Sequence, residues 1–377
     1  MKIKTLIKRI EWVNFLFLLL SPLVGITGTI WIFMHGGPHP ATIALLLLMM
    51  GLTGLGVTAG YHRCFTHCSF KAHWAVKLYF LLFGGAAFEG SAREWCCAHR
   101  KHHSDVDTDG DPYNIQKGFW YAHIGWVVFK SDQSDESCIP DLLRDRLITW
   151  QSRYYIPLAV CIGFVLPTAL AALWGDPIGG FFIAGVLRVV INHHLTFLIN
   201  SYCHFFGKQT YSDKDSARDS WLMAFFTYGE GYHNFHHAFQ TDFRNGFRPH
   251  HFDPTKWFIH ALHRLGLASD LHRVHPERIL KAKLAMDEKR LRTLTPFQQR
   301  FHDGEQYISK VRQNIEDQYA RLLVLKAQYR SMKKEKMITM REKIEELKIE
   351  IRTVQEEFNE SILLWHSLLK GNLKPIS

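Results

Sequence analysis

The stretch VNFLFLLLSPLVGITGTIWIFM, Val13–Met34, runs for 22 residues without a charged side chain. A helix needs about 20 apolar residues to cross the hydrocarbon core of a bilayer. The stretch is long for the apolar part of a secretory signal, and no small-residue cleavage site closes it. It follows four basic residues, Lys2, Lys4, Lys8 and Arg9. We therefore predict a transmembrane helix here.

Three more apolar stretches have a similar length, and they are Ala41–Ala59, Tyr155–Trp174 and Ile178–Ile199. The polar turns HGGPHP (35–40) and GDP (175–177) join the four stretches into two hairpins. Pro167 predicts a kink in the third helix. The apolar stretch Ala75–Phe88 is shorter and contains Lys77, so we expect an interfacial or buried helix rather than a span. The chain is predicted to be an all-α integral membrane protein.

The positions of lysine and arginine predict the orientation in the membrane. Neither hairpin turn contains either residue, whereas the N-terminus, residues 60–153 and the chain after residue 200 are rich in both. The positive-inside rule then places both termini and the polar segments on the cytoplasmic side of a multi-pass protein. The net charge of +10 suits an anionic membrane face, and we expect no nucleic-acid partner.

Arg188 is a charged residue inside the fourth predicted span. Ionisable residues within a membrane mark functional sites by default. The alternative is that Arg188 pairs locally or extends its side chain to the membrane interface, and the sequence leaves both interpretations open.

The cysteines predict reduced thiols. They are odd in number and form no CxxC motif. The seven residues are Cys64, Cys68, Cys96, Cys97, Cys138, Cys161 and Cys203.

Residues 281–377 are densely charged and differ from the membrane domain predicted for residues 1–280. Apolar residues recur there at steps of three and four, at Ile308, Val311, Ile315, Tyr319, Leu322, Leu325 and Tyr329. After KKEK (333–336) they resume at Met340, Ile344, Leu347, Ile351, Val354 and Phe358. This seam predicts a coiled-coil-like extension or a helical hairpin. It could join two copies into a homodimer or pack on its own domain.

Three compact histidine clusters stand out among the 23 histidines. Their members are His62 and His67 (HX4H), His99, His102 and His103 (HX2HH), and His233, His236 and His237 (HX2HH). On an α-helix, positions i, i+3 and i+4 share a face, so each HX2HH cluster aims three imidazoles at one place. The HX4H pair diverges by about 140° on an α-helix, so it needs a helix end or a loop, or faces two ions.

Eight imidazoles exceed the four ligands of one zinc ion, so two metal ions fit better. Imidazole suits iron, zinc, copper and nickel. A pair of irons beside a membrane is a natural site for O2 activation.

The second cluster opens the stretch HRKHHSDVDTDGDP (99–112), whose aspartates suggest a different metal. Asp105, Asp107, Asp109 and Gly110 fit the first half of a calcium-binding loop. The twelfth position of that loop should be a glutamate, and it is Gln116. We therefore expect these aspartates to cap the helix, balance nearby cations or orient the histidines.

The segments HRCFTH, HRKHH and GEGYHNFHH (229–237) resemble the three histidine boxes of membrane fatty acyl desaturases. The flanking segments TAGYHR (58–63), REWCCAHRKHH (93–103), DPYN (111–114), KGFWYAHIGW (117–126) and NSYCHFFG (200–207) resemble that family too, over roughly residues 10–275. The resemblance implies a four-helix membrane protein with a cytosolic helical cap that holds two iron ions. It implies that the eight box histidines are metal ligands and adds His204 as a ninth. It also implies that the amide of Asn200 holds a metal-bound water, whereas His193 and His194 have no counterpart.

The implied activity is O2-dependent introduction of a cis double bond, at the ninth bond of a saturated C16–C18 acyl chain carried by coenzyme A. One departure weakens the choice of carrier. The animal acyl-CoA enzymes have an Arg-Asp pair before the second box, where this chain has Cys97 and Ala98. Acyl carrier protein or a membrane lipid stays open as the carrier. A histidine-box hydroxylase is the rival enzyme, and a metal transporter or scaffold is the rival outside enzymes.

No cytochrome b5-like segment is recognised, so electrons are expected from a ferredoxin, a cytochrome b5-like protein or a flavoprotein reductase. A narrow apolar tunnel would set the position of the double bond, because a methylene chain offers no polar group to recognise. Leu46 and Met50 lie three to four turns before His62, and we predict that one of them helps to close the tunnel.

Overall fold

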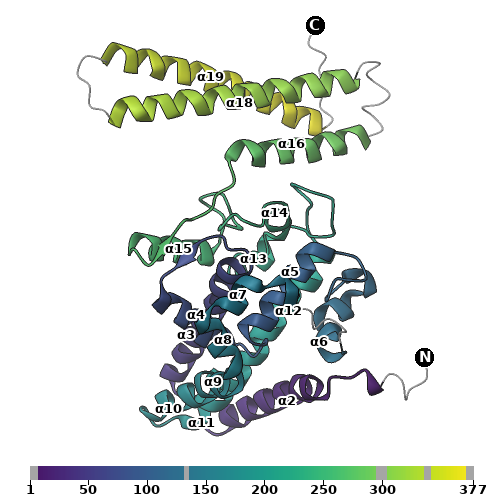
Figure 1. The fold of residues 1–377 in the computed structure, drawn as a ribbon, viewed down its shortest axis with the longest axis vertical. Helices are drawn as coiled ribbons and strands as arrows, with labels where there is room; N and C mark the ends of the chain where they lie inside the picture. Colours follow the sequence, from purple (N-terminus) through teal and green to yellow (C-terminus); the bar gives the residue numbers. More distant parts are fainter. Residues whose placement is uncertain (1–6, 131–135, 294–303, 335–340, 371–377) are drawn as a thin grey trace. The chain divides into compact units, whose positions relative to one another are not determined.

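The computed structural model describes residues 7–130, 136–293, 304–334 and 341–370 (Figure 1). Lys2, Lys4, Met340 and the end of the KKEK segment lie outside these ranges. The chain divides into two compact units. The first comprises Met1–Gln209 and Asp213–Arg273, and the second comprises Thr210–Ser212 and Val274–Ser377.

Within the described residues, the first unit has four helices long and apolar enough to cross a membrane. They are Trp12–Met34, Pro40–Thr66, Tyr155–Ala172 and Pro177–Phe205. Several are composite, and the successive elements are α2 (Trp12–Met34), α3 (Pro40–Leu55), η1 (Gly56–Thr66), α9 (Tyr155–Val160), η5 (Cys161–Val165), α10 (Leu166–Ala172), α11 (Pro177–Gly179), η6 (Gly180–Leu187) and α12 (Arg188–Phe205). The prediction of an all-α integral membrane protein with two hairpins is confirmed.

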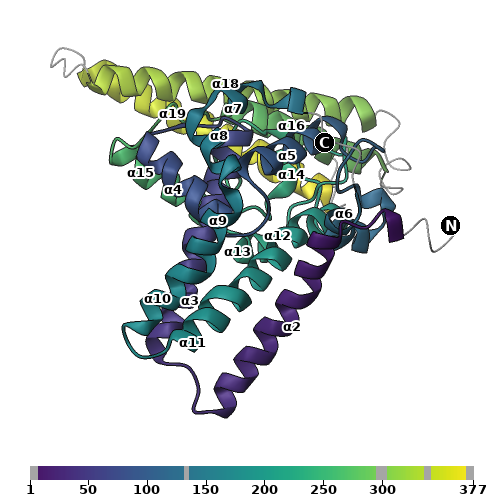
Figure 2. The same ribbon diagram turned by 60° about the horizontal axis from the view of Figure 1, so that its bottom comes forward.

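The two hairpins are joined where their turns meet, at the lower end of the helices in Figure 2. Asp176 is the N-cap residue of α11, and its carboxylate accepts hydrogen bonds from the backbone N–H of His39 (3.0 Å) and from Thr42 Oγ1 (2.6 Å). Trp174 Nε1 in turn donates to Thr42 Oγ1 (2.9 Å). The turns therefore hold the helices together at one end, and the histidine-bearing segments lie at the other.

The remaining elements of the first unit form the cap at that other end. They are β1 (Lys71–Ala72), α4 (Trp74–Gly85), α5 (Ala92–Asp105), η2 (Ile115–Lys117), η3 (Tyr121–Gly125), α6 (Trp126–Val128), η4 (Glu136–Cys138), α7 (Pro140–Arg144), α8 (Arg146–Arg153), α13 (Trp221–Phe226), α14 (His233–Ala238), α15 (Pro254–Arg264) and β2 (Ala268–Ser269). The two short strands pair antiparallel, Lys71 with Ser269 and Ala72 with Ala268. Helix α4 buries Phe80 and Leu81, in agreement with a buried helix rather than a span.

Arg188 donates a hydrogen bond to a carbonyl of the third span that Pro167 cannot reach. Proline has no N–H, so Pro167 cannot donate to the carbonyl of Gly163 four residues earlier. The fully buried Arg188 supplies a donor instead, from Nη2 to the Gly163 oxygen at 3.1 Å. Its Nη1 donates to the Ala86 oxygen at 2.9 Å. A carbonyl without a donor costs several kcal/mol in hydrocarbon, so Arg188 has the local structural role.

The second unit contains α16 (Pro276–Thr293), α18 (Gly304–Lys334) and α19 (Arg341–Leu369). Helices α18 and α19 form an antiparallel hairpin, linked by Arg321 with Glu350 (2.8 Å) and Lys326 with Gln355 (2.9 Å). The predicted seam is buried within the unit at Ile308, Val311, Ile315, Leu322, Leu325 and Val354. The sequence left open a coiled-coil-like extension or a helical hairpin, and the structure has the hairpin. The buried residues of the seam pack within one chain.

Candidate metal centre

All nine histidines predicted as ligands lie in two groups whose ring nitrogens are within 4.8 Å of one another in each group. The first group is His62, His67, His99, His103 and His236, and the second is His102, His204, His233 and His237. His193 and His194 belong to neither group. His193 Nε2 contacts the Phe88 carbonyl, and His194 Nδ1 contacts His123 Nε2.

The HX4H pair converges because η1 is a π-helix. In a π-helix the N–H of residue i+5 bonds the carbonyl of residue i, so residue i+5 stands about one turn above residue i. The backbone N–H of His67 donates to the His62 oxygen at 3.1 Å, and the two rings lie 4.8 Å apart. Both residues therefore belong to one group, through a helix type that α-helical geometry did not predict.

The prediction that each HX2HH cluster aims all three rings at one place is wrong. Helix α5, whose first turn is fixed by a capping box between Ser91 and Glu94, sends His99 and His103 to the first group and His102 to the second. Helix α14 does the converse, with His233 and His237 in the second group and His236 in the first. The i,i+4 pair of each helix stays together, and the i+3 ring crosses to the neighbouring group. Two adjacent sites are thus built from the same two helices.

Acceptors outside the groups hold the histidines in the first group. His62 Nδ1 lies 2.8 Å from Glu230 Oε2, and His99 Nδ1 lies 3.0 Å from the Tyr113 hydroxyl. A carboxylate can only accept, so the contact with Glu230 favours a proton on Nδ1 of His62, while Nε2 faces His236 inside the group.

In the second group the outer acceptors are mostly aspartates. His102 Nδ1 lies 2.9 Å from Asp111 Oδ1, and His237 Nδ1 lies 3.4 Å from Asp215 Oδ2. His204 Nδ1 donates to Ser216 Oγ (2.8 Å), because that hydroxyl itself donates to Asp107 Oδ1 (2.6 Å). Asp107 and Asp111 come from the stretch that imitates a calcium loop, and both orient histidines.

The inward nitrogens fit metal ions. His62 Nε2 and His236 Nε2 are 3.0 Å apart, and so are His204 Nε2 and His233 Nε2. Nε2 of His67 and of His102 is buried without a hydrogen-bond partner in the part of the chain that the structure describes. Converging lone pairs repel one another unless a cation lies among them. The donor set is nitrogen throughout, which suits transition metals such as iron or zinc.

The electrostatic surroundings favour the neutral form of five of these imidazoles. Burial and the repulsion of neighbouring histidines lower the pKa of His67, His99, His103, His233 and His236 well below the ordinary value. Only a neutral imidazole has a lone pair to bind a metal, so these five rings are in the ligating form at neutral pH.

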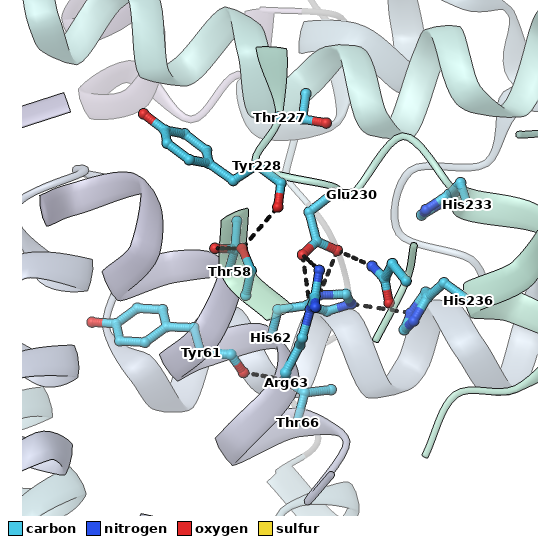
Figure 3. A network of polar contacts seen from close by, with 12 residues as sticks. Thr58, Tyr61, His62, Arg63, Thr66, Thr227, Tyr228, Glu230, His233 and His236 are labelled. Atoms are coloured by element: carbon cyan, nitrogen blue, oxygen red, sulfur yellow. Dashed lines mark hydrogen bonds and ion pairs between the residues drawn. The ribbon is translucent and has the colours of Figure 1, made fainter. Parts of the chain in front are cut away.

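A buried ionic network anchors the first group (Figure 3). Glu230 lies between His62 and Arg63, with its Oε1 at 2.9 Å from Arg63 Nη2. Arg63 also binds Asp253 (3.0 Å) and donates to the Phe243 carbonyl (2.8 Å). Burial opposes the ionisation of Glu230, but Arg63 and His62 outweigh it and hold the pKa of Glu230 below its ordinary value. The carboxylate therefore stays charged and fixes His62.

Glu230, Arg63, Asp215 and Ser216 are parts of the site that were not predicted from the sequence. Two of them had a signal in the motifs, since Arg63 follows His62 directly and Glu230 lies in GEGYHNFHH. Asp215 and Ser216 lie in a loop without a periodic pattern, and only the fold brings them to His237 and His204.

A cavity of about 1160 Å³ adjoins the first and second groups, and His62, His99 and His233 form part of its wall. Most of the wall is apolar, with Phe17, Phe88, Phe164 and Phe197 among its residues. Asn200 lines the same cavity, as a residue that holds a metal-bound water would. Pockets for small ligands usually have volumes of about 300–1,000 Å³, so the space suffices for a long chain molecule.

Neither Leu46 nor Met50, of which one is predicted from the sequence to close the tunnel, lines this cavity. From the same composite helix, Thr53, Gly54, Val57 and Thr58 form the wall. Leu46 instead packs against the cluster around Leu45 and Met49. Counting helical turns back from His62 gives a distance along the helix but does not identify which of its residues line the cavity.

Asp111→Asn is expected to weaken metal binding by about 10–100-fold, because the amide no longer orients His102 as a carboxylate does. Chelator competition on the purified protein measures this change. Asp109→Asn is the matched control, since Asp109 holds no histidine among the residues that the structure describes, and it should bind metal as the native chain does. Equal affinity in both variants would contradict the role of Asp111.

Comparisons with known proteins agree with this geometry. The family model described as "Fatty acid desaturase" matches residues 37–256. "Acyl-CoA desaturase 1" of Saccharomyces cerevisiae is 37% identical over 290 residues, which is 75% of this chain and 56% of that protein. "Stearoyl-CoA desaturase 5" of Bos taurus is 35% identical over 248 residues, 64% of this chain and 74% of that protein.

A bacterial relative is covered almost completely. "sn-1 stearoyl-lipid 9-desaturase" of Anabaena variabilis is 35% identical over 268 residues, which is 70% of this chain and 94% of that protein. By contrast, the chain spans less than two thirds of the length of its relatives from Saccharomyces cerevisiae and Schizosaccharomyces pombe. The family model covers more than half of this chain and includes all three histidine clusters. The chain belongs to the fatty acid desaturase family.

Proposed function

We propose that the protein is an O2-dependent fatty acyl desaturase whose nine histidines hold two iron ions. The observation that carries the proposal is the pair of adjacent groups of inward-facing imidazoles beside a long apolar cavity. A transporter would place its ligands near the middle of the membrane. Here His62 and His204 lie toward the ends of their spans, and the other box histidines lie beyond the spans.

When bound, the two irons would supply the oxidising power that removes hydrogen from adjacent methylenes with O2, which no side-chain acid or base can do. The protein's own part is to position the reactants. Glu230, Asp111 and the Asp107–Ser216 pair fix the ring orientations, and Trp95 stacks on His99 with ring centroids 4.9 Å apart. The largely apolar cavity wall would hold an acyl chain against His62, His99 and His233.

The proposed substrate is a saturated C16–C18 chain, and the proposed product carries a cis double bond at the ninth position. The printed names of the relatives include both acyl-CoA and lipid-linked substrates. Cys97 and Ala98 line the cavity together with Lys101 and Arg153, two cations that suit the phosphates of coenzyme A. These cations favour acyl-CoA, with an intact lipid or acyl carrier protein as the alternative carrier.

The distribution of lysine and arginine supports a cytoplasmic metal centre with both termini on the same side. Electrons would come from a ferredoxin, a cytochrome b5-like protein or a reductase. A homodimer through the C-terminal helices stays a prediction, which size-exclusion chromatography with light scattering tests. Part of the apolar seam is buried within the α18–α19 hairpin, whereas Val324, Ile349 and Leu363 are exposed on it.

The experiment that tests the proposal is expression in a host that lacks its own desaturase, followed by mass spectrometry of the fatty acids. Loss of two hydrogens at one position supports desaturation, whereas gain of oxygen would identify a hydroxylase. Unchanged fatty acids from a host with a matched electron donor would contradict both. Metal analysis of the purified protein checks for two irons per chain.

Phe164→Ala is expected to shift the products toward longer acyl chains. The ring of Phe164 lines the cavity and stacks on Phe88 with centroids 4.8 Å apart, so its removal lengthens the available space. One methylene in an apolar pocket is worth about 1–3 kcal/mol, enough to raise the ratio of C18 to C16 products several-fold. Met50→Ala, outside the cavity, is the control and should leave the ratio unchanged. An unaltered ratio in Phe164→Ala would show that another wall sets chain length.

A further inference from the structure

Two cysteines of the cap lie in direct sulfur contact. Cys97 is on α5 and Cys138 ends η4, and their Sγ atoms are 2.9 Å apart. The Cys138 thiol also lies 3.8 Å from the Cys97 carbonyl oxygen. A disulfide bond is about 2.05 Å long, so less than an ångström of movement separates this contact from a bond.

Ionic contacts on both sides keep the two thiols together. Arg93 on α5 pairs with Glu136 of η4. One turn beyond Cys97, Arg100 Nη1 donates to the Cys138 carbonyl at 2.9 Å. Arg100 also pairs with Asp141 on α7.

Helix α5 therefore contacts η4 with one face and presents histidines to the two groups with another. One face of α5 carries Arg93, Cys97 and Arg100, which have the spacing i, i+4 and i+7. This face contacts η4. His99, His102 and His103 extend toward the two groups of imidazoles. A covalent change at Cys97 thus acts on the helix that carries three of the nine histidines.

Small oxidants can reach the pair. Cys97 and Glu136 both line the large cavity, and Cys138 is only partly buried. Cys64, Cys96 and Cys203 are buried, and Cys68 and Cys161 are exposed on other elements. In a reducing compartment a disulfide is usually transient and serves redox sensing.

We propose that Cys97 and Cys138 form a redox-active dithiol that hydrogen peroxide converts into a reversible disulfide. One sulfur attacks a peroxide oxygen, the O–O bond breaks, and a sulfenic acid and one water result. The second sulfur then attacks the sulfenic sulfur, the S–O bond breaks, and a second water leaves as the S–S bond forms. Two thiols and one peroxide thus yield one disulfide and two waters. A dithiol reductant such as dithiothreitol reverses the oxidation.

The disulfide would tie η4 to α5 along the cavity wall. Since Glu136, Cys97 and Lys101 share that wall, the covalent link prevents the two segments from separating to admit or release a chain molecule. The expected slowing of turnover rests on the proposed function, whereas the formation of the bond does not.

Peptide mapping of the full-length protein in detergent tests the chemistry. The protein is treated with hydrogen peroxide, remaining thiols are blocked with N-ethylmaleimide, and the digest is analysed by mass spectrometry. We expect a peptide pair linked through Cys97 and Cys138 that has lost two hydrogens and separates after dithiothreitol. Cys138→Ser should lack this pair, and Cys161→Ser, the matched control, should keep it. Full maleimide labelling of Cys97 and Cys138 after peroxide, or linkage to Cys68 instead, would overturn the proposal.

A second measurement tests the effect on turnover. The activity ratio before and after peroxide is compared within each variant, so that differences in basal activity do not matter. A several-fold fall in the native protein, restored by dithiothreitol and absent in Cys138→Ser, supports regulation through the pair. An equal fall in Cys138→Ser would overturn the regulatory role. If no desaturation is found in any variant, the proposed function fails and the mapping result still stands or falls by itself.

Discussion

Alanine at His102 is expected to lower desaturation by more than about 100-fold and to lower the metal content of the purified protein. Removal of an outer partner alone typically costs 10–100-fold in metal affinity or activity, and loss of the ligand itself is more severe. His102 belongs to the second group, where four buried imidazoles converge, and its Nε2 atom has no hydrogen-bond partner among the described residues. Three rings would remain, which is too few to complete that site.

The measurement combines fatty-acid analysis in a desaturase-deficient host with elemental analysis of the purified protein. His194→Ala is the matched control, because His194 lies outside both groups and contacts His123 instead. We expect the control to keep its metal and activity. A folded His102→Ala protein with full metal content would exclude His102 as a ligand.

Methionine at Arg63 is expected to lower the free energy of unfolding by about 3–5 kcal/mol, the usual cost of removing one partner from a buried ionic group. Arg63 is 1% exposed and pairs with Glu230 and Asp253, which are also buried. Methionine fills a similar volume but leaves the two carboxylates without their cation and the Phe243 carbonyl without its donor. His62 would lose its fixed orientation at the same time, through Glu230.

Thermal unfolding in detergent measures this effect. Lys71→Met is the matched control, because Lys71 pairs with Asp270 at the surface, where both side chains are exposed. Exposed pairs contribute little to stability, so we expect nearly the native melting temperature for the control. If the two variants melt together, the network around Arg63 does not stabilise the fold.

The sequence predicted the membrane fold because spans are specified by composition and length, which neighbours do not alter. It also predicted all nine histidines that gather in the structure, since three clusters and the NSYCHFFG segment carry them. It failed where geometry depends on tertiary contacts. Which group each of His99, His102 and His103 joins depends on how α14 packs beside α5. The location of the cavity depends on how side chains pack around Val57 and Phe164.

The π-helix η1 has a consequence for how the second span can vary in length. The buried stripe of α3, Thr42, Leu45, Met49 and Thr53, faces the other spans, while His62 and His67 face the metal groups. Each residue of an α-helix rotates the chain by about 100°, so loss of one residue between the stripe and His62 would turn the stripe toward lipid or the histidines away from their partners. The π-helix therefore sets the rotation of the two histidines about the helix axis relative to the buried face of α3. The number of residues between membrane stripe and histidines is therefore as constrained as their identity.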